Sequence, residues 1–208
     1  MSAAAVSFGS LRLYDYPDSG NGYKVRLLLA LLARPYALTP VDILKGETRT
    51  PEFLAMNPNG RVPVLELDDG RRLAESNAIL FYLAHGSQYL PTDPWERAKV
   101  LQWLCFEQYS HEPYIATLRY WIRHVDLNGT RGLLAEEKRR GGEAALRLMN
   151  EHLSAHRFIV GHDLTIADIA LYAYTHVANQ AGFDIDRYPS LKRWLNEVAK
   201  LPRYVPMF

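Results

Sequence analysis

Cysteine is nearly absent: the 208 residues include only Cys105, so no disulfide bond can form within the chain. Such scarcity is typical of proteins in a reducing compartment. No apolar run reaches the roughly 18 residues that a membrane span needs. The opening stretch MSAAAVSFGS has neither a basic segment nor a long apolar one, which argues against a secretory signal. We therefore expect a cytoplasmic protein with a loose N-terminal extension.

An excess of either charge is also missing. Lysine and arginine number 24 and acidic residues 23, which gives a net charge of +1. Proteins that bind nucleic acids or membrane surfaces usually carry a basic face, so neither partner is predicted. The motifs G-x-G-x-x-G, G-x-S-x-G and the P-loop are absent. His152 and His156 have a spacing seen in metal sites but lack the accompanying glutamate, and no metal site is predicted.

The first 85 residues contain alternating and helical patterns in a definite order. Apolar residues alternate with polar ones near the start, and leucines then recur at helical spacing. The sequence DDG at 68–70 is a typical turn between two antiparallel strands, so it favours a hairpin. The predicted elements are a strand within 10–16, a helix through 25–32, strands at 38–43, 62–67 and 71–74, and a helix at 75–84. This order is a βαβ unit followed by a ββα unit.

After residue 85 the residue patterns predict only helices. The segment 85–94 has the glycine and proline content of a linker, and Asp93-Pro94 is a typical helix start. In the helix that follows, Leu101, Leu104, Cys105 and Gln108 share one stripe, so Cys105 is predicted to be a small buried core residue. Further helices are predicted around 133–156, 166–177 and 190–201. Gly141-Gly142 indicates either a bend or a break, and Thr165 with Asp168 forms a capping-box pattern.

Two candidate sites lie where predicted helices begin. The turn PDSGNG places Ser19 and Asn21 at a helix start, where unpaired N–H groups and the helix dipole attract anions. Either side chain can cap the helix or donate a hydrogen bond to an anion, and the residue types alone favour capping. The triplet ESN at 75–77 offers a similar choice. Its serine and backbone can bind a carboxylate and Glu75 an ammonium group, but a plain cap is the favoured interpretation from the residues alone.

A third candidate loop is NPNGRVPVL at 57–65. Pro63 lies between two apolar strand formers, where proline removes a backbone donor and belongs at a strand start, an edge or a bulge. A cis Val62–Pro63 bond would turn the Val62 backbone outward. Most X–Pro bonds are trans, so the residues alone predict trans.

Five stretches, in this order and spacing, resemble a known family: LYDYPDSGNGYKVRLLLALL, PEFLAMNPNGRVPVLELDDG, LAESNAILFYLA, DLTIADIALYAY and YPSLKRWLNEVAKLPRYVPM. The chain resembles the cytosolic glutathione S-transferases of bacteria, of the type with serine or asparagine in the active-site loop. The resemblance runs from about Leu11 to Met207. It implies an α/β thioredoxin-like domain at 9–85 that binds glutathione, and an all-α domain at 93–208 that forms the electrophile pocket.

The resemblance also implies roles for individual residues. Ser19 would donate a hydrogen bond to the glutathione thiolate, with Asn21 the second candidate and Tyr16 the third. Pro63 would be cis, so that Val62 offers its backbone to the cysteinyl part of glutathione. The γ-glutamyl end and the glycyl carboxylate would be held by Glu75, Ser76, Arg61 and Lys45. The electrophile would lie among Tyr16, Tyr109, Tyr114, Arg119 and Trp121.

The function implied by the resemblance is glutathione transfer to a small apolar electrophile, with glutathione as co-substrate and no metal. The expected assembly is a homodimer. Two alternatives stay open: glutathione disulfide-dependent reductase or peroxidase activity, and a non-enzymatic binding module on the same fold. The active-site loop has no cysteine, and the Ser-Ser-Cys motif of the maleylacetoacetate isomerases is absent. The cysteine-dependent branches of the family are therefore disfavoured.

Overall fold

The computed structural model describes residues 9–208, and the chain divides into two compact units. The first unit runs to Leu90 and also includes the segment Pro202–Phe208, and the second spans Pro91–Leu201. The predicted domains at 9–85 and 93–208 do not anticipate that the 202–208 segment belongs with the first unit. No helix in the described part of the chain is long and apolar enough to cross a membrane.

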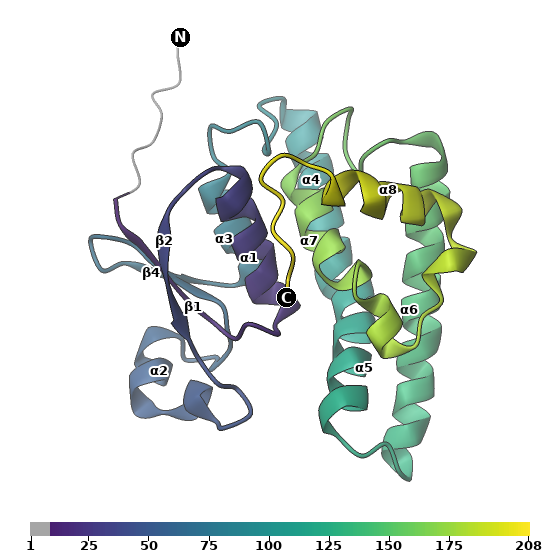
Figure 1. The fold of residues 1–208 in the computed structure, drawn as a ribbon, viewed down its shortest axis with the longest axis horizontal. Coiled ribbons are helices and arrows are strands. Elements are labelled where there is room, and N and C mark those ends of the chain that lie inside the picture. Colours follow the sequence, from purple (N-terminus) through teal and green to yellow (C-terminus); the bar gives the residue numbers. More distant parts are fainter. Residues whose placement is uncertain (1–8) are drawn as a thin grey trace. The chain divides into compact units, whose positions relative to one another are not determined.

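The first unit is built on a four-stranded sheet with the strand order β2-β1-β3-β4 (Figure 1). Strand β1 is parallel to β2 and antiparallel to β3, which is antiparallel to β4. The predicted βαβ and ββα units are therefore confirmed. The elements are β1 (Leu11–Asp15), α1 (Gly20–Leu31), β2 (Tyr36–Pro40), α2 (Pro51–Met56), β3 (Val64–Glu66), β4 (Arg72–Ala74) and α3 (Ser76–Leu83).

The sheet separates α1 and α3 from α2. The alternation of β1 buries Leu11, Leu13 and Asp15, and α1 packs beside α3 (Figure 1). On the other face, Tyr14 packs against the small core that Phe53 of α2 forms with its buried neighbours. Period-two alternation in the strand and an apolar helix face thus give a layered core.

In this unit one predicted strand is displaced and one helix was missed. The second strand lies at Tyr36–Pro40 rather than 38–43, because β2 is an edge strand whose residues are mostly exposed, including Leu38. Helix α2 was not predicted, since it has six residues and buries only Phe53. Its start nevertheless has a recognisable signal: the Thr50 hydroxyl accepts a hydrogen bond from Phe53 N, and Pro51 occupies the first helical turn.

The second unit is all-helical over the described residues 91–201, as predicted. Its helices are α4 (Pro94–Phe106), α5 (Glu112–His124), α6 (Thr130–Ala155), α7 (Ile166–Thr175) and α8 (Pro189–Ala199), and a π-helical turn (Glu107–His111) joins α4 to α5. The Asp93 side chain accepts a hydrogen bond from Glu96 N and caps α4, which confirms the predicted helix start.

Helix α6 runs without a break through Gly141-Gly142, which settles the choice that the sequence left open. A Cβ atom at Gly141 would lie 2.2 Å from the Tyr114 ring, and one at Gly142 would lie 2.3 Å from the Phe183 ring. The two glycines therefore permit close packing against aromatic rings, although glycine weakens a helix interior.

The prediction for Cys105 was wrong. Cys105 is exposed, and so are Leu101 and Gln108. The buried residues of α4 are Val100, Trp103 and Leu104. The buried stripe is thus rotated by about one residue, or roughly 100° around the helix, from the predicted stripe.

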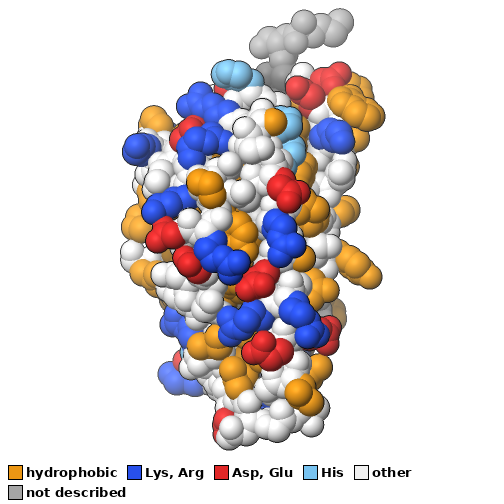
Figure 2. Space-filling view, turned by 90° about the vertical axis from the view of Figure 1, so that its right-hand side faces the viewer, with side chains coloured by type: hydrophobic (Ala, Val, Ile, Leu, Met, Phe, Trp, Pro, Cys, Tyr) orange, Lys and Arg blue, Asp and Glu red, His pale blue; other side chains and the backbone are white. Residues whose placement is uncertain are grey.

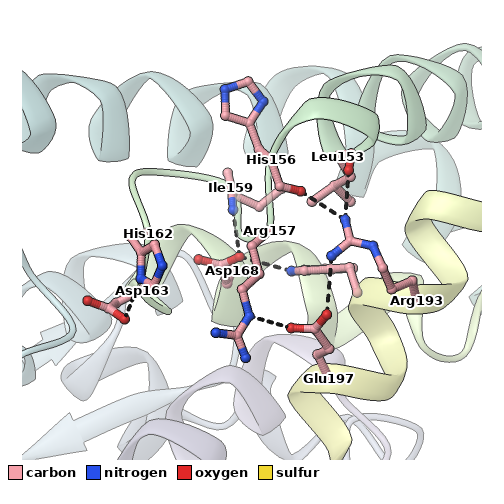
Figure 3. Close-up of polar contacts among 10 residues, drawn as sticks. Leu153, His156, Arg157, Ile159, His162, Asp163, Asp168, Arg193 and Glu197 are labelled. Atoms are coloured by element: carbon pink, nitrogen blue, oxygen red, sulfur yellow. Dashed lines mark hydrogen bonds and ion pairs between the residues drawn. The ribbon is translucent and has the colours of Figure 1, made fainter.

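Hydrogen bonds connect α6, α7 and α8 (Figure 3). Asp168 and Thr165 form the predicted capping box at the start of α7. Asp168 Oδ1 also accepts from Ile159 N at 2.8 Å and from Trp194 Nε1 at 2.9 Å. Arg193 on α8 donates to the carbonyls of Leu153 and His156, where α6 ends. Several backbone groups near these helix ends therefore have specific side-chain partners.

Charges of both signs alternate on the side of the helical unit that carries α6 and α8 (Figure 2). The helical unit also contains surface ion pairs, including Lys192 with Asp186 at 2.6 Å and Arg157 with Glu197 at 2.7 Å. These pairs are partly or fully exposed, so each adds little stability. This face thus matches the balanced charge of the sequence.

Candidate functional site

Ser19 caps helix α1. Its Oγ accepts a hydrogen bond from Gly22 N at 3.3 Å, and its backbone N–H donates to Tyr16 O at 2.8 Å, which closes a tight turn. The capping interpretation favoured by the residue type is therefore confirmed for Ser19. Because the hydroxyl is an acceptor in the cap, its own hydrogen can still be donated to another group. Capping and donation are thus compatible at this residue.

Asn21 is connected to the start of α3 by a chain of side-chain hydrogen bonds. Lys24 Nζ donates to Ser76 Oγ at 3.3 Å, and Ser76 Oγ donates to Asn21 Oδ1 at 3.2 Å. Lys24 is fully buried. An ammonium group can only donate, so the chain has one direction, from Lys24 through Ser76 to Asn21. The two predicted helix-start sites therefore adjoin one another.

Lys24 was missed by the sequence analysis. The available signal was a single lysine within the apolar stretch GYKVRLLL. A lysine is rarely buried unless it has a partner. That partner, Ser76, lies 52 residues away along the chain, so the pairing itself could not be found from local sequence.

The loop at 57–63 is shaped by asparagine hydrogen bonds and a cis proline. The Val62–Pro63 peptide bond is cis, as the resemblance implied, so the trans expectation from the residues alone was wrong. Asn57 Nδ2 donates to Arg61 O at 2.8 Å, and Asn57 Oδ1 accepts from Asn59 N at 3.1 Å. The paired part of β3 begins at Val64, so Val62 and Pro63 precede the sheet ladder.

Glu75 joins this loop to α3. Asn59 Nδ2 donates to Glu75 Oε1 at 3.5 Å. Glu75 is exposed and has a φ of 67°, a left-handed conformation that is uncommon for a residue other than glycine. Backbone conformations of this kind persist where the surrounding structure enforces them, and they gather at functional sites. The strained residue directly precedes Ser76, the first residue of α3.

The two predicted basic ligands are exposed. Lys45 forms an ion pair with Asp42 at 3.3 Å in the loop after β2. Arg61 lies in the 57–63 loop and is exposed. Neither is held in a rigid geometry by a buried partner, so both side chains can reorient toward a carboxylate. Their roles stay predictions.

A buried ion pair lies beneath the Ser19 turn. The carboxylate of Asp15, which ends β1, lies 3.1 Å from Arg26 Nε and is fully buried. Burial raises the pKa of Asp15 to about 7, and the charge of Arg26 opposes that rise only in part. Burial likewise raises the pKa of the nearby Tyr36. The folded surroundings therefore favour the protonated form of Asp15 more than solvent does.

The four predicted pocket residues of the helical unit differ in their surroundings. Tyr109 is 84% exposed in the π-helical turn. Tyr114 packs over Gly141, with Lys138 Nζ 5.1 Å from its ring centroid. Arg119 is buried, and its Nε donates to Gln180 at 2.8 Å. Trp121 on α5 is half-buried. Tyr16, the predicted pocket residue of the first unit, is half-buried as well. A role in binding an electrophile stays a prediction for all five residues.

Potential metal ligands do not gather in groups of three or more anywhere within residues 9–208. His152 and His156 stack instead, with ring centroids 4.1 Å apart. The His152 ring also packs against Trp103 and bonds to the carbonyl of Ile159. This pair therefore has a packing role in the helical unit.

Two family models match the chain. The glutathione S-transferase N-terminal domain matches residues 9–85, and the glutathione S-transferase C-terminal domain matches residues 105–202. The first match contains the three candidate loops and the whole Lys24–Ser76–Asn21 chain. The second covers most of the helical unit.

Curated relatives include transferase-like proteins and a translation factor. A glutathione S-transferase-like protein of Fusarium sp is 32% identical over 195 residues, which are 88% of this chain and 85% of that protein. Elongation factor 1-gamma of Mus musculus is 31% identical over 208 residues, which are 92% of this chain but 45% of that protein. The chain thus spans less than half the length of the latter relative.

Solved structures of similar fold include a glutathione S-transferase from Pseudomonas fluorescens Pf-5, with 51% identity and a TM-score of 0.92, covering 95% of this chain and 98% of that one. A glutathione transferase from Burkholderia graminis has 26% identity and a TM-score of 0.83, covering 93% and 85%. That structure holds two glutathione molecules per subunit.

Proposed function

Because the chain belongs to the glutathione S-transferase family, we propose that it binds glutathione and stabilises its thiolate for attack on a small apolar electrophile. One observation carries the proposal: the three candidate loops adjoin one another in the first unit. The Ser76–Asn21 bond connects α3 to α1, and the Asn59–Glu75 bond connects the cis-proline loop to α3. A plain scaffold does not need this arrangement of polar groups.

In this proposal Ser19 donates its hydroxyl hydrogen to the glutathione sulfur. Lowering a thiol pKa from about 8.5 by two units requires about 2.7 kcal/mol of preferential thiolate stabilisation. A hydrogen bond to a charged group contributes about 1.5–3 kcal/mol, and a helix N-terminus adds about 0.3–1 kcal/mol. The free energy that the Ser19 hydroxyl and the start of α1 supply together is therefore large enough to produce this pKa shift. Asn21 is the second donor candidate.

The remaining contacts hold the glutathione backbone. The Val62 backbone, which lies before the sheet ladder, pairs with the cysteinyl part of the peptide. Ser76 and Glu75 hold the γ-glutamyl end, and Arg61 with Lys45 reaches the glycyl carboxylate. In the reaction the thiolate electron pair forms a carbon–sulfur bond to the electrophile while a leaving group such as chloride departs with its bonding pair.

The test combines binding with activity. Wild-type protein should be retained on immobilised glutathione and should conjugate a chlorinated nitroaromatic compound. The Ser19→Ala/Asn21→Ala variant should lose at least about tenfold in kcat/KM, because the donor to the sulfur is gone. Ser154→Ala/Asn179→Ala, two exposed positions in the helical unit, is the matched control. Unchanged thiolate formation and activity in the first variant would refute the Ser19 and Asn21 assignment.

Disulfide reduction is a second candidate, favoured by the two glutathione molecules per subunit in the Burkholderia graminis relative. A first glutathione thiolate attacks a disulfide sulfur and expels one thiolate. A second glutathione then attacks the mixed disulfide, which yields glutathione disulfide and a second thiol. No protein cysteine is needed. A coupled assay with a small mixed disulfide distinguishes this activity from conjugation, and a parallel assay with an organic hydroperoxide covers peroxidase activity.

The non-enzymatic alternative is supported by the elongation factor 1-gamma relatives. A binding module would keep the fold without activating a thiol. Titration calorimetry that detects no glutathione binding would favour this alternative over both enzymatic ones. Binding without any measurable thiolate would favour a glutathione-binding module.

Homodimerisation is supported by exposed residues on α4 and on the π-helical turn that follows it, namely Leu101, Cys105 and Tyr109. These three residues are four apart along the chain, so they lie near one face, and exposed apolar patches mark interaction surfaces. Light scattering should give twice the chain mass, and Leu101→Glu should reduce it. The control is Leu133→Glu, which changes an exposed leucine on α6. A monomeric wild type would refute this proposal. A cytoplasmic location is likewise proposed and is checked by cell fractionation.

A further inference from the structure

Arg26 on α1 contacts three separate parts of the first unit. Its Nε lies 3.1 Å from Asp15 Oδ2, at the end of β1. Its Nη2 donates to Pro17 O at 2.6 Å, in the turn that leads to Ser19. Its Nη1 donates to Met207 O at 3.4 Å, in the 202–208 segment. The side chain is only 13% exposed. One planar guanidinium therefore joins a strand end, a turn and a distant segment.

The contact with Pro17 bears directly on Ser19. The turn is closed by the bond from Ser19 N to Tyr16 O at 2.8 Å, so Pro17 is one of its two central residues. Holding the Pro17 carbonyl fixes the peptide plane in the middle of the turn. The position of the Ser19 hydroxyl depends on that plane, because only one residue separates Pro17 from Ser19.

The 202–208 segment lies along the same helix. Tyr23 Oη donates to Val205 O at 2.8 Å, and the Met207 side chain is buried. Tyr23 and Arg26 are neighbours on one face of α1, with the guanidinium carbon 5.6 Å from the Tyr23 ring centroid. The segment therefore has two side-chain anchors on α1, and one of them is the group that also holds the Ser19 turn.

We propose that Arg26 is a positioning residue for the turn that carries Ser19, and that the 202–208 segment supports it by holding its guanidinium. The inference rests on the proposed function for its effect on the thiol, but the positioning itself is testable without glutathione.

Arginine suits this role better than lysine does. Its donors are arranged in a rigid fork, so one group can reach a carboxylate and two carbonyls in different directions. A lysine at the same place keeps the positive charge beside Asp15 but cannot hold all three partners in that geometry. Arg26→Lys therefore separates positioning from charge.

The experiment compares four proteins: wild type, Arg26→Lys, a variant ending after Tyr204, and the combination of the two changes. Arg72→Lys, an exposed arginine on β4 that pairs with Glu66, is the matched control. Hydrogen exchange without glutathione measures the opening of peptides that cover residues 13–22. Affinity for S-methylglutathione reports the binding site without a thiol. Thiolate absorbance against pH gives the pKa of bound glutathione.

Arg26→Lys should accelerate exchange in the Ser19 turn and raise the bound thiol pKa by about one unit, a tenfold change in the thiolate equilibrium. S-methylglutathione affinity should change by less than about threefold, since the remaining contacts persist. Shortening the chain should act in the same direction. The combined variant should show less than the sum of the two effects, because both act through one guanidinium. Arg72→Lys should match wild type.

Several outcomes overturn the inference. Unchanged exchange in the Ser19 turn of Arg26→Lys excludes positioning, and additive effects exclude the link to the 202–208 segment. An equal loss of S-methylglutathione affinity indicates general disruption of the binding site. If Arg26→Lys does not fold, the Arg26→Met/Asp15→Asn variant, which removes both charges, is tested for the same exchange. Wild type without any bound thiolate refutes the proposed function, whereas the exchange result still decides the positioning.

Discussion

Gly22→Ala provides a test in which local propensity and tertiary structure predict opposite signs. In a helix interior, alanine is favoured over glycine by about 1 kcal/mol. At this position, however, an added Cβ would lie 1.6 Å from Asp15 Oδ1 and 2.0 Å from Asp15 Cγ. Asp15 is fully buried and paired with Arg26 at 3.1 Å. The carboxylate must therefore move by more than 1 Å against close-packed neighbours.

The expected cost follows from these contacts. Overpacking in a core costs about 1–3 kcal/mol, and disturbing a buried ion pair adds a further cost of similar order. Even after the propensity gain, we expect Gly22→Ala to lower the free energy of unfolding by about 2–4 kcal/mol. Urea unfolding monitored by tryptophan fluorescence and circular dichroism measures this change through the midpoint.

A double-mutant cycle identifies the cause. In an Asp15→Ala background the obstructing carboxylate is gone, so Gly22→Ala should be neutral or stabilising by up to about 1 kcal/mol. Stabilisation by Gly22→Ala in the wild-type background would refute the close approach. Equal destabilisation in both backgrounds would assign the cost to the backbone at Gly22 rather than to Asp15.

Three further predictions concern buried groups. Because the pKa of Asp15 is raised to about 7, the folded state binds this proton more tightly than the unfolded state does. Its contribution to the free energy of unfolding should therefore decline from about pH 4 to about pH 7, as urea titrations of wild type against Asp15→Asn will measure. Asp168→Asn places an amide among buried donors and should cost about 1–3 kcal/mol in urea unfolding. Gly142→Ala should lower thermal stability by about 1–3 kcal/mol through its clash with Phe183, and Phe183→Leu should restore part of that loss.

Sequence patterns predicted the elements whose burial follows a simple period. Strand β1 buries alternate residues, and Asp93 and Thr165 mark helix starts by their own hydrogen bonds. Strand β2 was displaced because an edge strand does not bury a regular face, and Leu38 is 42% exposed. The α4 stripe was misplaced because apolar residues occur all around that helix. Hydrophobicity alone then cannot identify the buried side.

The candidate site was predicted where a residue type has a local role, and missed where a role depends on distant partners. Ser19 and Ser76 were found because both lie at predicted helix starts. Lys24 and Arg26 lie within a helix, where charged residues are usually solvated. Lys24 bonds to Ser76, which is 52 residues away along the chain. Arg26 bonds to Met207, which is 181 residues away. No local pattern contains such information.

Ser19 can cap α1 and donate a hydrogen bond to an anion at the same time, although from the residue type these two roles were alternatives. As the cap of α1, its oxygen accepts from Gly22 N, and this bond fixes the side chain against the helix N-terminus. A hydroxyl held in this way can direct its hydrogen toward an anion placed at the same helix start. The cap therefore supplies the preorganisation that thiolate stabilisation needs. Ser19→Asp separates the two roles, because a carboxylate retains the capping acceptor but offers no hydrogen and repels a thiolate. We expect Ser19→Asp to unfold at nearly the wild-type urea midpoint yet to form almost no bound thiolate, whereas Ser19→Ala should lose about 1 kcal/mol as well.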